Sequence, residues 1–258
     1  MSWRRFEGLL RLKGAGLDVA SIPTPSNMML VHFILLLQLQ VAHPLQSLVF
    51  EGGGVRGTVY AGAVVALEEA GALANIHNFA GTSAGSSAAA MLAVGYTACE
   101  FSNEVMVQSF ADLVEFSLFN RVKLAVLGSG TSALANLLGR QKGFFSGRSL
   151  EDAADIAIAK KLCSIDLNIS FSSITQDDLK EERDATAMEG KCAFYRRASF
   201  GLLNDLNHGS KKLSISSFDI TNGTLVYFNV GTAADMAISK AIRMSSSIPL
   251  IFEPVEYK

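Results

Sequence analysis

The chain has 258 residues, of which 49% are hydrophobic and 18% are charged, so it can bury the core of one large domain. Its formal net charge of −2 gives no general attraction to nucleic acid, which we exclude as a partner, and none to anionic lipid beyond a local basic patch. The three cysteines, Cys99, Cys163 and Cys192, are odd in number and widely spaced, which indicates neither a disulfide framework nor a metal site and favours a reducing compartment.

Residues 1–45 have the composition of an N-terminal leader. Basic residues, glycines and prolines are mixed over 1–27, and a strongly apolar run follows over 28–39. That run is too short to cross a bilayer, since a spanning helix needs about 20 residues. It fits a signal-peptide core, a membrane-surface helix or a strand that pairs with the core, and we favour a structural or membrane-contacting element over a cleaved signal.

A glycine-rich turn at 52–57, Gly-Gly-Gly-Val-Arg-Gly, lies between a predicted strand at 48–50 and a predicted helix at 58–70. Such a turn aims backbone N–H groups at an anion. It matches the G-x-G-x-x-G spacing of a dinucleotide site, but the next strand does not end in the acidic residue that would hold the ribose. No Lys-Ser/Thr pair follows the glycines, so a P-loop is excluded too. The interpretation that remains is an oxyanion-binding loop.

A second turn at 81–85, Gly-Thr-Ser-Ala-Gly, follows a predicted strand at 76–80 and precedes a predicted alanine-rich helix at 86–94. A G-x-S-x-G turn between a strand and a helix exposes the serine hydroxyl as a nucleophile. The small residues after the serine let the helix begin close to the sheet. The alternative is a glycine-rich turn without chemistry, and we prefer the nucleophile because both turns occur about thirty residues apart.

The rest of the chain continues to alternate between strand and helix signals. The predicted elements are a helix at 103–116, a helix opened by a capping box at 149–152 and ending near 162, a strand at 166–171, two neighbouring strands or a hairpin at 213–218 and 224–229, a helix at 233–245 and a final extended run. A charged run at 177–184 is typical of a solvated surface and opens a polar insertion that we expect to be mobile as far as residue 212. The pattern predicts an α/β fold, a three-layer α/β/α sandwich with a mostly parallel central sheet and the site at its carboxyl edge.

The two turns, with their flanking residues 50–57 and 81–85, resemble the motifs of the patatin-like phospholipase family. Segments 142–147, 218–223 and 241–249 are similar to later parts of the family pattern, so the resemblance assigns residues 46–258 to one patatin-like domain. It implies hydrolysis of acyl esters in phospholipids, lysophospholipids or neutral glycerolipids without a metal or other cofactor. It also implies peripheral membrane contact, and we favour a cytoplasmic or membrane-associated location over secretion. Acyl transfer to an alcohol stays open, and the oligomeric state is not predicted.

The resemblance also implies roles for individual residues. Ser83 corresponds to the nucleophile of a Ser–Asp dyad. The oxyanion-hole residues are Gly52, Gly53, Gly54, Arg56 and Gly57, and the nucleophile elbow also contains Gly81, Thr82, Ala84 and Gly85. Arg56 would add positive charge or pin the loop, unless it is an ordinary surface arginine.

The catalytic aspartate of the family has no counterpart in the 258 residues. The family places it in an Asp-Gly-Gly or Asp-Gly-Ala motif shortly after a segment like 251–257, and no Asp-Gly pair occurs in this sequence. The expectations left open are a domain that is incomplete at its C-terminus, a non-catalytic lipid-binding or regulatory relative, and a base supplied by another group.

Other titratable residues fit the role of base poorly. His77 stands near the start of the strand that leads to Ser83, about 20 Å away at 3.3 Å per strand residue. His208 lies in a polar stretch and His32 in an apolar run, which predicts a solvated and a packed side chain respectively. Asp219 stands beside a predicted turn, which we expect it to cap.

Overall fold

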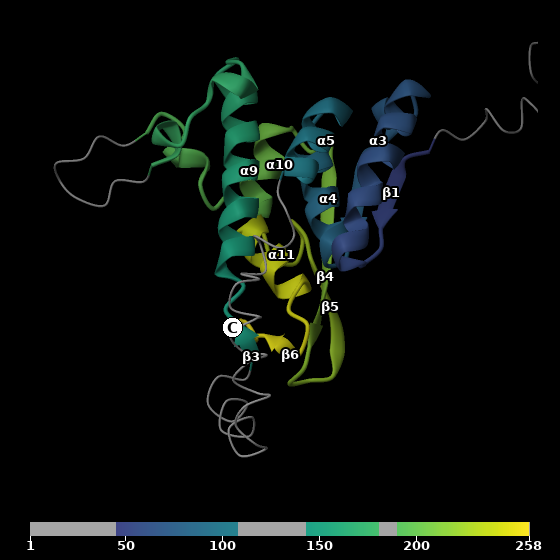
Figure 1. Ribbon diagram of the computed structural model, residues 1–258, viewed down its shortest axis with the longest axis vertical. Helices are drawn as coiled ribbons and strands as arrows, with labels where there is room; N and C mark the ends of the chain where they lie inside the picture. Colours follow the sequence, from purple (N-terminus) through teal and green to yellow (C-terminus); the bar gives the residue numbers. More distant parts are fainter. Residues whose placement is uncertain (1–44, 108–142, 181–189, 258) are drawn as a thin grey trace, which may run out of the picture. The chain divides into compact units, whose positions relative to one another are not determined.

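The computed structural model describes residues 45–107, 143–180 and 190–257, and these residues belong to one unit of the chain, Leu45–Lys258 (Figure 1). The predictions for the N-terminal leader, including the apolar run at 28–39, lie outside the described residues. So do the second half of the helix predicted at 103–116 and part of the charged run at 177–184.

A four-stranded sheet in the order β1-β2-β4-β5 organises this unit. The strands β1 (Ser47–Phe50), β2 (Asn78–Gly81) and β4 (Lys212–Asp219) are parallel, and β5 (Thr224–Phe228) pairs with β4 in the antiparallel direction. The α/β fold with a mostly parallel sheet flanked by helices is therefore confirmed, as is the hairpin of the last two strands.

Helices and a small second sheet complete the unit. The α-helices among the described residues are α3 (Val59–Glu69), α4 (Ala84–Ala93), α5 (Ala98–Val107), α9 (Arg148–Asp166), α10 (Phe200–Leu206) and α11 (Ile238–Ser245). The short 3-10 helices are η2 (Gly54–Thr58), η3 (Leu73–Asn75), η4 (Phe171–Ser173), η5 (Asp177–Leu179) and η6 (Ala193–Tyr195). The strands β3 (Gly143–Phe145) and β6 (Leu250–Phe252) form a separate parallel pair.

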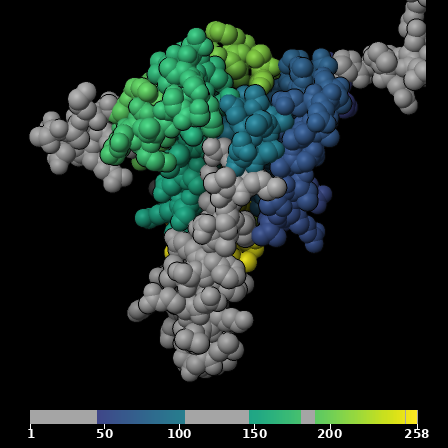
Figure 2. Space-filling view, turned by 45° about the horizontal axis from the view of Figure 1, so that its top comes forward, coloured from purple at the N-terminus to yellow at the C-terminus, as the bar shows by residue number. Residues whose placement is uncertain are grey.

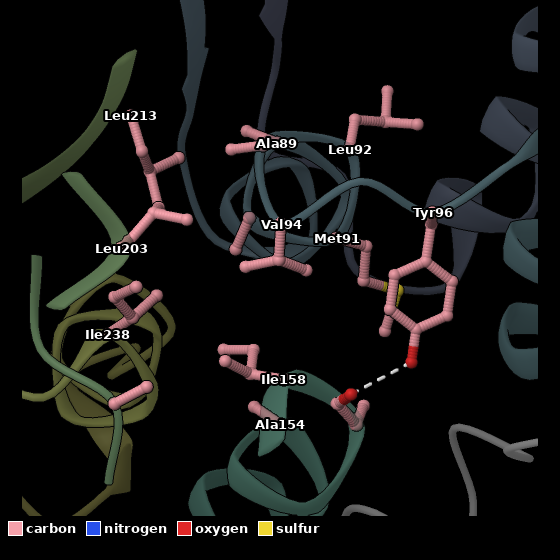
Figure 3. Packing of buried hydrophobic residues seen from close by; sticks show 14 of the residues in the cluster. Ala89, Met91, Leu92, Val94, Tyr96, Ala154, Ile158, Leu203, Leu213 and Ile238 are labelled. Carbon is pink, nitrogen blue, oxygen red and sulfur yellow. Dashed lines mark hydrogen bonds between the residues drawn. The ribbon is translucent and has the colours of Figure 1, made fainter. Parts of the chain in front are cut away.

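The core lies between one face of the sheet and the helices. Alternating residues of the strands point to this face, where Phe79, Leu213 and Ile215 are almost fully buried. The helix α4 crosses β1, β2 and β4, and its alanines let it lie close to them. Met91 and Val94 from the end of this helix face Ile158 of α9 (Figure 3). The site therefore stands on elements that are fixed by packing.

The opposite face of the sheet carries exposed apolar side chains. Val49 is 72% exposed, and Phe218, Leu225 and Tyr227 are each more than half exposed. These four residues share the face that the alternation of the strands turns away from the core. In the part of the chain that the structure describes, no helix covers these four side chains, so the second helical layer of the predicted three-layer sandwich is not found over them.

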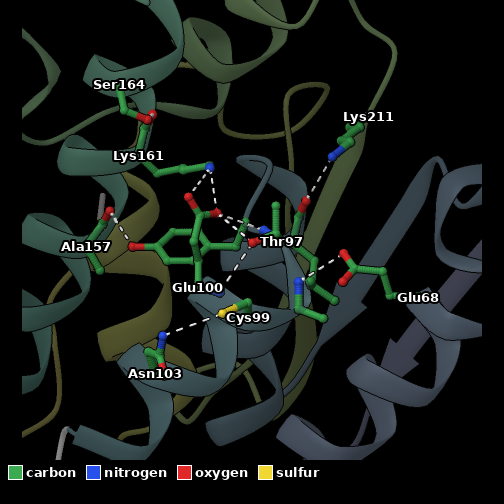
Figure 4. A network of polar contacts seen from close by, with 12 residues as sticks. Glu68, Thr97, Cys99, Glu100, Asn103, Ala157, Lys161, Ser164 and Lys211 are labelled. Atoms are coloured by element: carbon green, nitrogen blue, oxygen red, sulfur yellow. Dashed lines mark hydrogen bonds and ion pairs between the residues drawn. The ribbon is translucent and has the colours of Figure 1, made fainter. Parts of the chain in front are cut away.

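Three helices form a continuous outer surface on the face shown in Figure 2. The helices α3 and α5 are joined by a hydrogen bond from the Ala98 N–H to the Glu68 carboxylate, at 3.1 Å. The helices α5 and α9 are joined by an ion pair between Glu100 and Lys161, with 2.6 Å between Oε2 and Nζ (Figure 4).

The capping box predicted at 149–152 is wrong. The helix α9 begins at Arg148, after Gly147, which has a left-handed φ of 64° and no side-chain cap, and it continues to Asp166. A Cβ on Gly147 would lie 2.3 Å from Nε of the buried Arg243, so a side chain there would have to displace the arginine. The helix therefore begins beside Arg243, with Gly147 and not Ser149 at its N-cap.

The strand predicted at 166–171 is also wrong. The chain leaves α9 through Asn168, whose φ is 51°, and the Ile169 N–H returns to the Ser164 carbonyl oxygen at 3.0 Å. These bonds end the helix and satisfy the backbone groups that a strand would have had to pair with a neighbour. The alternation of apolar residues in this stretch comes from side chains that pack beside the end of the helix.

The polar insertion expected as far as residue 212 is not a loose segment where it is described. After residue 190 it contributes Tyr195, Phe200 and Leu203 to the buried core, and it forms η6 and α10. The helix predicted at 233–245 is shorter than expected and begins at Ile238, and the helix predicted from residue 103 begins earlier, at Ala98.

The expectation that the cysteines form no disulfide is wrong. Cys163 of α9 and Cys192 are disulfide-bonded, with their Cα atoms 5.5 Å apart, and both are fully buried. The third cysteine, Cys99, is free and exposed. Spacing along the chain could not show this pairing, because the two partners are 29 residues apart and meet only in the folded protein.

Candidate active site

Ser83 stands on a strained turn between β2 and α4. Its φ is 52° and its ψ is −125°, a conformation that residues with a Cβ rarely adopt. The turn is held by hydrogen bonds from the Gly85 N–H to the Thr82 carbonyl oxygen and from the Ser86 N–H to the Ser83 carbonyl oxygen, both at 2.8 Å. The Ser86 hydroxyl also donates to the Ser83 carbonyl oxygen, at 2.5 Å. The serine thus lies on a rigid elbow at the carboxyl edge of the sheet.

The two glycines that flank the elbow are required by close backbone contacts. A Cβ on Gly81 would lie 2.1 Å from the Gly85 carbonyl oxygen, and a Cβ on Gly85 would lie 2.4 Å from the Phe50 carbonyl oxygen. No side chain fits at such distances. The spacing of glycines around Ser83 is therefore a consequence of how tightly the elbow lies against the end of β1.

The glycine-rich loop at 52–57 packs directly against this elbow. A Cβ on Gly52 would lie 3.4 Å from the Ser83 Cβ, and a Cβ on Gly57 would lie 3.1 Å from the Ala84 Cβ. The structure thus brings together the two motifs that the sequence places about thirty residues apart. They meet because β1 and β2 are parallel neighbours that end level, with Phe50 beside Gly81.

Three backbone N–H groups at this junction have no acceptor among the residues that the structure describes. Gly53 precedes the helical turn η2 and Gly54 begins it, while Ala84 is the first residue of α4. The first N–H groups of a helix have no partner within the helix. None of the three donates a hydrogen bond to another described residue. Such groups can stabilise a negatively charged oxygen.

Arg56 does not pin the loop to another described residue. Its side chain is exposed and forms no ion pair or hydrogen bond within the described part of the chain. The loop is held instead by the Tyr60 hydroxyl, which donates to the Glu51 carbonyl oxygen at 2.6 Å, and by the Thr58 hydroxyl, which donates to the Val55 carbonyl oxygen at 3.0 Å. Sequence reasoning did not assign Tyr60 a role.

Ser245 is a second residue that the sequence analysis missed. Its hydroxyl oxygen, at the end of α11, accepts a hydrogen bond from the Ser83 N–H at 2.8 Å. A further bond of 2.5 Å joins the hydroxyl groups of Thr82 and Ser216, which ties the elbow to β4. The only signal for Ser245 was the resemblance of segment 241–249 to a family helix, which carried no role for this residue.

An apolar cavity of about 150 Å³ adjoins Ser83. Its wall includes Gly54 of the glycine-rich loop and, among the most deeply buried residues, Phe101 and Ile158. Val55 and Ile248 also line it and are more than half exposed, so they mark its mouth. A serine hydroxyl beside free N–H groups and an apolar cavity can attack a carbonyl group whose substituent is a hydrocarbon chain.

No base for Ser83 is found among the described residues. The Ser83 hydroxyl forms no hydrogen bond with them, and His77 and His208 are exposed. Asp219 caps its turn as expected: its carboxylate accepts from the Thr221 N–H and from the backbone and side-chain amides of Asn222. The bonds from Asn222, followed by that from Thr221, hold the pKa of Asp219 below its ordinary value despite slight opposition from burial.

Neither a metal centre nor a membrane span is found where the structure is described. These residues contain no group of three or more His, Cys, Asp or Glu side chains that could hold an ion. None of their helices is both long enough and apolar enough to cross a bilayer.

Known proteins match this chain in sequence and in fold. The model of the family described as patatin-like phospholipase matches residues 48–258. The chain is 29% identical over 217 residues to the uncharacterized protein YqhO of Bacillus subtilis, and 25% identical over 212 residues to the probable lipid hydrolase 463L of Invertebrate iridescent virus 6. These matches cover 81% and 82% of this chain but only 58% and 56% of the relatives, so the chain spans little more than half of their length.

Two solved structures share the fold. A crystal structure of full-length ExoU with SpcU, from the type III secretion system of Pseudomonas aeruginosa, matches with a TM-score of 0.52 and 26% identity. The match covers 81% of this chain and 39% of that chain. VipD from Legionella pneumophila matches with a TM-score of 0.55 and 18% identity over 83% of this chain and 44% of that one, which shows the fold alone.

Proposed function

This chain belongs to the patatin-like phospholipase family, and from that premise we propose that it hydrolyses acyl-ester bonds of lipids with Ser83 as the nucleophile. The observation that carries the proposal is the strained elbow at Ser83, which adjoins both the glycine-rich loop and an apolar cavity. The cavity would hold the hydrocarbon chain of the substrate, and phospholipids, lysophospholipids and neutral glycerolipids all carry such a chain.

In the proposed mechanism the Ser83 hydroxyl attacks the carbonyl carbon of the ester. The negative charge on the carbonyl oxygen is stabilised by the N–H groups of Gly53, Gly54 and Ala84, and loss of one such donor typically slows an enzyme about 100- to 1000-fold. The alcohol leaves with a proton, and an acyl group remains on Ser83. Water then attacks this acyl-enzyme, which releases the fatty acid and restores the serine. If another alcohol took the place of water, the same site would transfer the acyl group.

We propose that the base that accepts the Ser83 proton is a carboxylate from outside the described residues. One observation supports this: Ser83 has no acidic or histidine partner among the described residues. The resemblance of the two turns to the family's motifs also implies an aspartate in this role. The Ser83 N–H is already bonded to Ser245, so the donor that the elbow contributes to the oxyanion is the N–H of Ala84.

Labelling with a fluorescent fluorophosphonate tests the proposed nucleophile. We expect the wild-type chain to be labelled and the Ser83→Ala variant not to be, because only an activated serine with a working oxyanion site attacks the probe. A Ser87→Ala variant, which changes another serine of the cavity wall, is the matched control and should keep its label.

Ester hydrolysis measured on the same three proteins completes the test. Unchanged hydrolysis in Ser83→Ala would contradict the mechanism. A folded wild-type chain that neither reacts with the probe nor hydrolyses any acyl ester would contradict catalysis by this chain. It would favour the alternative of a non-catalytic lipid-binding relative, for which the apolar cavity already provides a site. Product analysis in the presence of an alcohol separates hydrolysis from transfer.

A further inference from the structure

Four exposed aliphatic residues belong to the two segments, 55–59 and 248–251, that contribute to the mouth of the cavity beside Ser83. Val55 is 59% exposed and Ile248 is 51% exposed, although both line the cavity. Each is accompanied by a second exposed residue nearby in the chain. Val59, the first residue of α3, is 67% exposed and follows Val55 by four residues. Ile251 of β6 is 40% exposed, and its N–H donates to the Ile248 carbonyl oxygen at 3.1 Å. We refer to these four residues as the apolar rim.

The rim differs from scattered surface hydrophobics because two of its residues, Val55 and Ile248, also line the cavity. Isolated exposed apolar residues are normal, whereas an apolar group that continues into an apolar cavity marks a contact surface. An acyl chain that entered the cavity from water would expose its hydrocarbon on the way. If the rim lay in the surface of a bilayer, the chain would pass from lipid to cavity without contact with water.

The charge beside the rim indicates which surface it contacts. Arg56 lies between Val55 and Val59, is exposed and has no partner for its guanidinium within the described residues. Arg148, which is two residues before the cavity residue Leu150, is exposed as well. Basic side chains beside an apolar contact are attracted to anionic headgroups, although the chain as a whole carries a net charge of −2.

We propose that the apolar rim, with Arg56, is the surface by which this chain docks on a phospholipid bilayer that contains anionic lipid, and that it aligns the cavity with the acyl chains of that bilayer. The proposal rests on the proposed function for its choice of partner. It goes beyond that function because it assigns membrane binding to residues that take no part in the chemistry, such as Val59 and Ile251.

The test is binding to vesicles of phosphatidylcholine with 30% phosphatidylserine, by sedimentation, with the Ser83→Ala background of the full chain so that no lipid is consumed. We expect Val59→Asp with Ile251→Asp to weaken vesicle binding at least tenfold, because a carboxylate does not enter the apolar part of a bilayer. Phe194→Asp is the matched control: Phe194 is 70% exposed on η6, and this substitution should leave binding unchanged. Arg56→Gln should weaken binding to the anionic vesicles more than to pure phosphatidylcholine.

Equal binding by the rim variant and its background would overturn the proposal, as would loss of binding in the Phe194→Asp control alone. An unchanged thermal unfolding temperature shows that each variant is folded. Hydrolysis of a soluble short-chain ester separates the two proposals. In the protein that keeps Ser83, Val59→Asp with Ile251→Asp should leave this hydrolysis intact, because neither residue lines the cavity. If the wild-type chain hydrolyses no ester but the rim variants lose vesicle binding, the catalytic proposal fails and the docking surface stands.

Discussion

At the scale of the residue, both backbone groups of Ser83 are occupied. Its carbonyl oxygen accepts bonds from Ser86, and its N–H donates to the Ser245 hydroxyl oxygen. A positive φ at a residue with a Cβ costs on the order of 1–3 kcal/mol and persists only where neighbouring groups hold it. Because Ser245 belongs to α11, both this helix and the elbow hold the backbone of Ser83 in place.

We therefore expect Ser245→Ala to lower kcat about three- to tenfold, as loss of one hydrogen bond of about 1 kcal/mol would. KM should hardly change, because Ser245 does not line the cavity. Steady-state kinetics on a soluble ester measure both constants, and Ser245→Thr, which keeps the hydroxyl, should recover part of the rate. A rise in KM with an unaltered kcat would show that Ser245 does not position the nucleophile.

At the scale of the element, a polar network joins α5 to α9 (Figure 4). Burial by itself raises the pKa of Glu100, but hydrogen bonds from Lys161 and Thr97 and the charge of Lys161 outweigh it, so the net pKa lies below the ordinary 4.5. The neighbouring Lys211 donates to the Leu92 carbonyl oxygen at the end of α4, and its pKa is lowered by burial and by repulsion from Lys161.

The Glu100–Lys161 pair should make stability depend on acid pH. Because the pKa of Glu100 is lower in the folded chain than in the unfolded chain, its contribution is complete well above pH 4.5 and is lost as the pH falls through the lower folded-state value. We expect Glu100→Gln to lower the free energy of unfolding at pH 7 by about 1–3 kcal/mol, since it leaves the largely buried Lys161 without its charge partner. The variant should also lose less stability than the wild type between pH 7 and pH 3.

Urea unfolding at both pH values measures this effect, and Glu69→Gln, on the exposed surface of α3, is the control. An identical pH dependence of unfolding in wild type and Glu100→Gln would show that the pair does not contribute.

At the scale of the whole molecule, one covalent link ties α9 to the segment that follows residue 189. The Cys163–Cys192 disulfide spans 29 residues and is buried beside Tyr195, whose hydroxyl donates to Asp166. It holds in place the chain that leads to α10 and β4, and so supports the sheet from the side of α9.

Chain entropy for a loop of this length predicts that Cys192→Ser lowers the free energy of unfolding by about 3–4 kcal/mol. The midpoint of urea unfolding should fall accordingly, and a reducing agent should have the same effect on the wild type. Cys99→Ser, at the exposed free cysteine, should leave the midpoint of urea unfolding unchanged within experimental error. Three reactive thiols in the denatured, unreduced protein would contradict the disulfide.

The local signals of the sequence located most of the fold around the site. The strands at β1 and β2, the two glycine turns and the helices that follow them were predicted within a few residues, because each signal lies within one short stretch. Gly81 and Gly85 are a clear case. They contact each other and the end of β1 through backbone atoms that leave no room for a side chain, so the tight turn requires glycine at both positions. The two glycines in the sequence therefore indicate the turn directly.

Only the tertiary structure decided which distant groups complete the site. Ser245 lies 162 residues from Ser83, and Arg243, 96 residues beyond Gly147, packs beside the start of α9. Serine and arginine are common in such stretches, so nothing in their neighbourhood distinguishes them. The cavity, the apolar rim and the Cys163–Cys192 disulfide likewise could not be predicted from local sequence. Each exists because packing brings together segments that are far apart in the chain, and a local pattern carries no information about that distance.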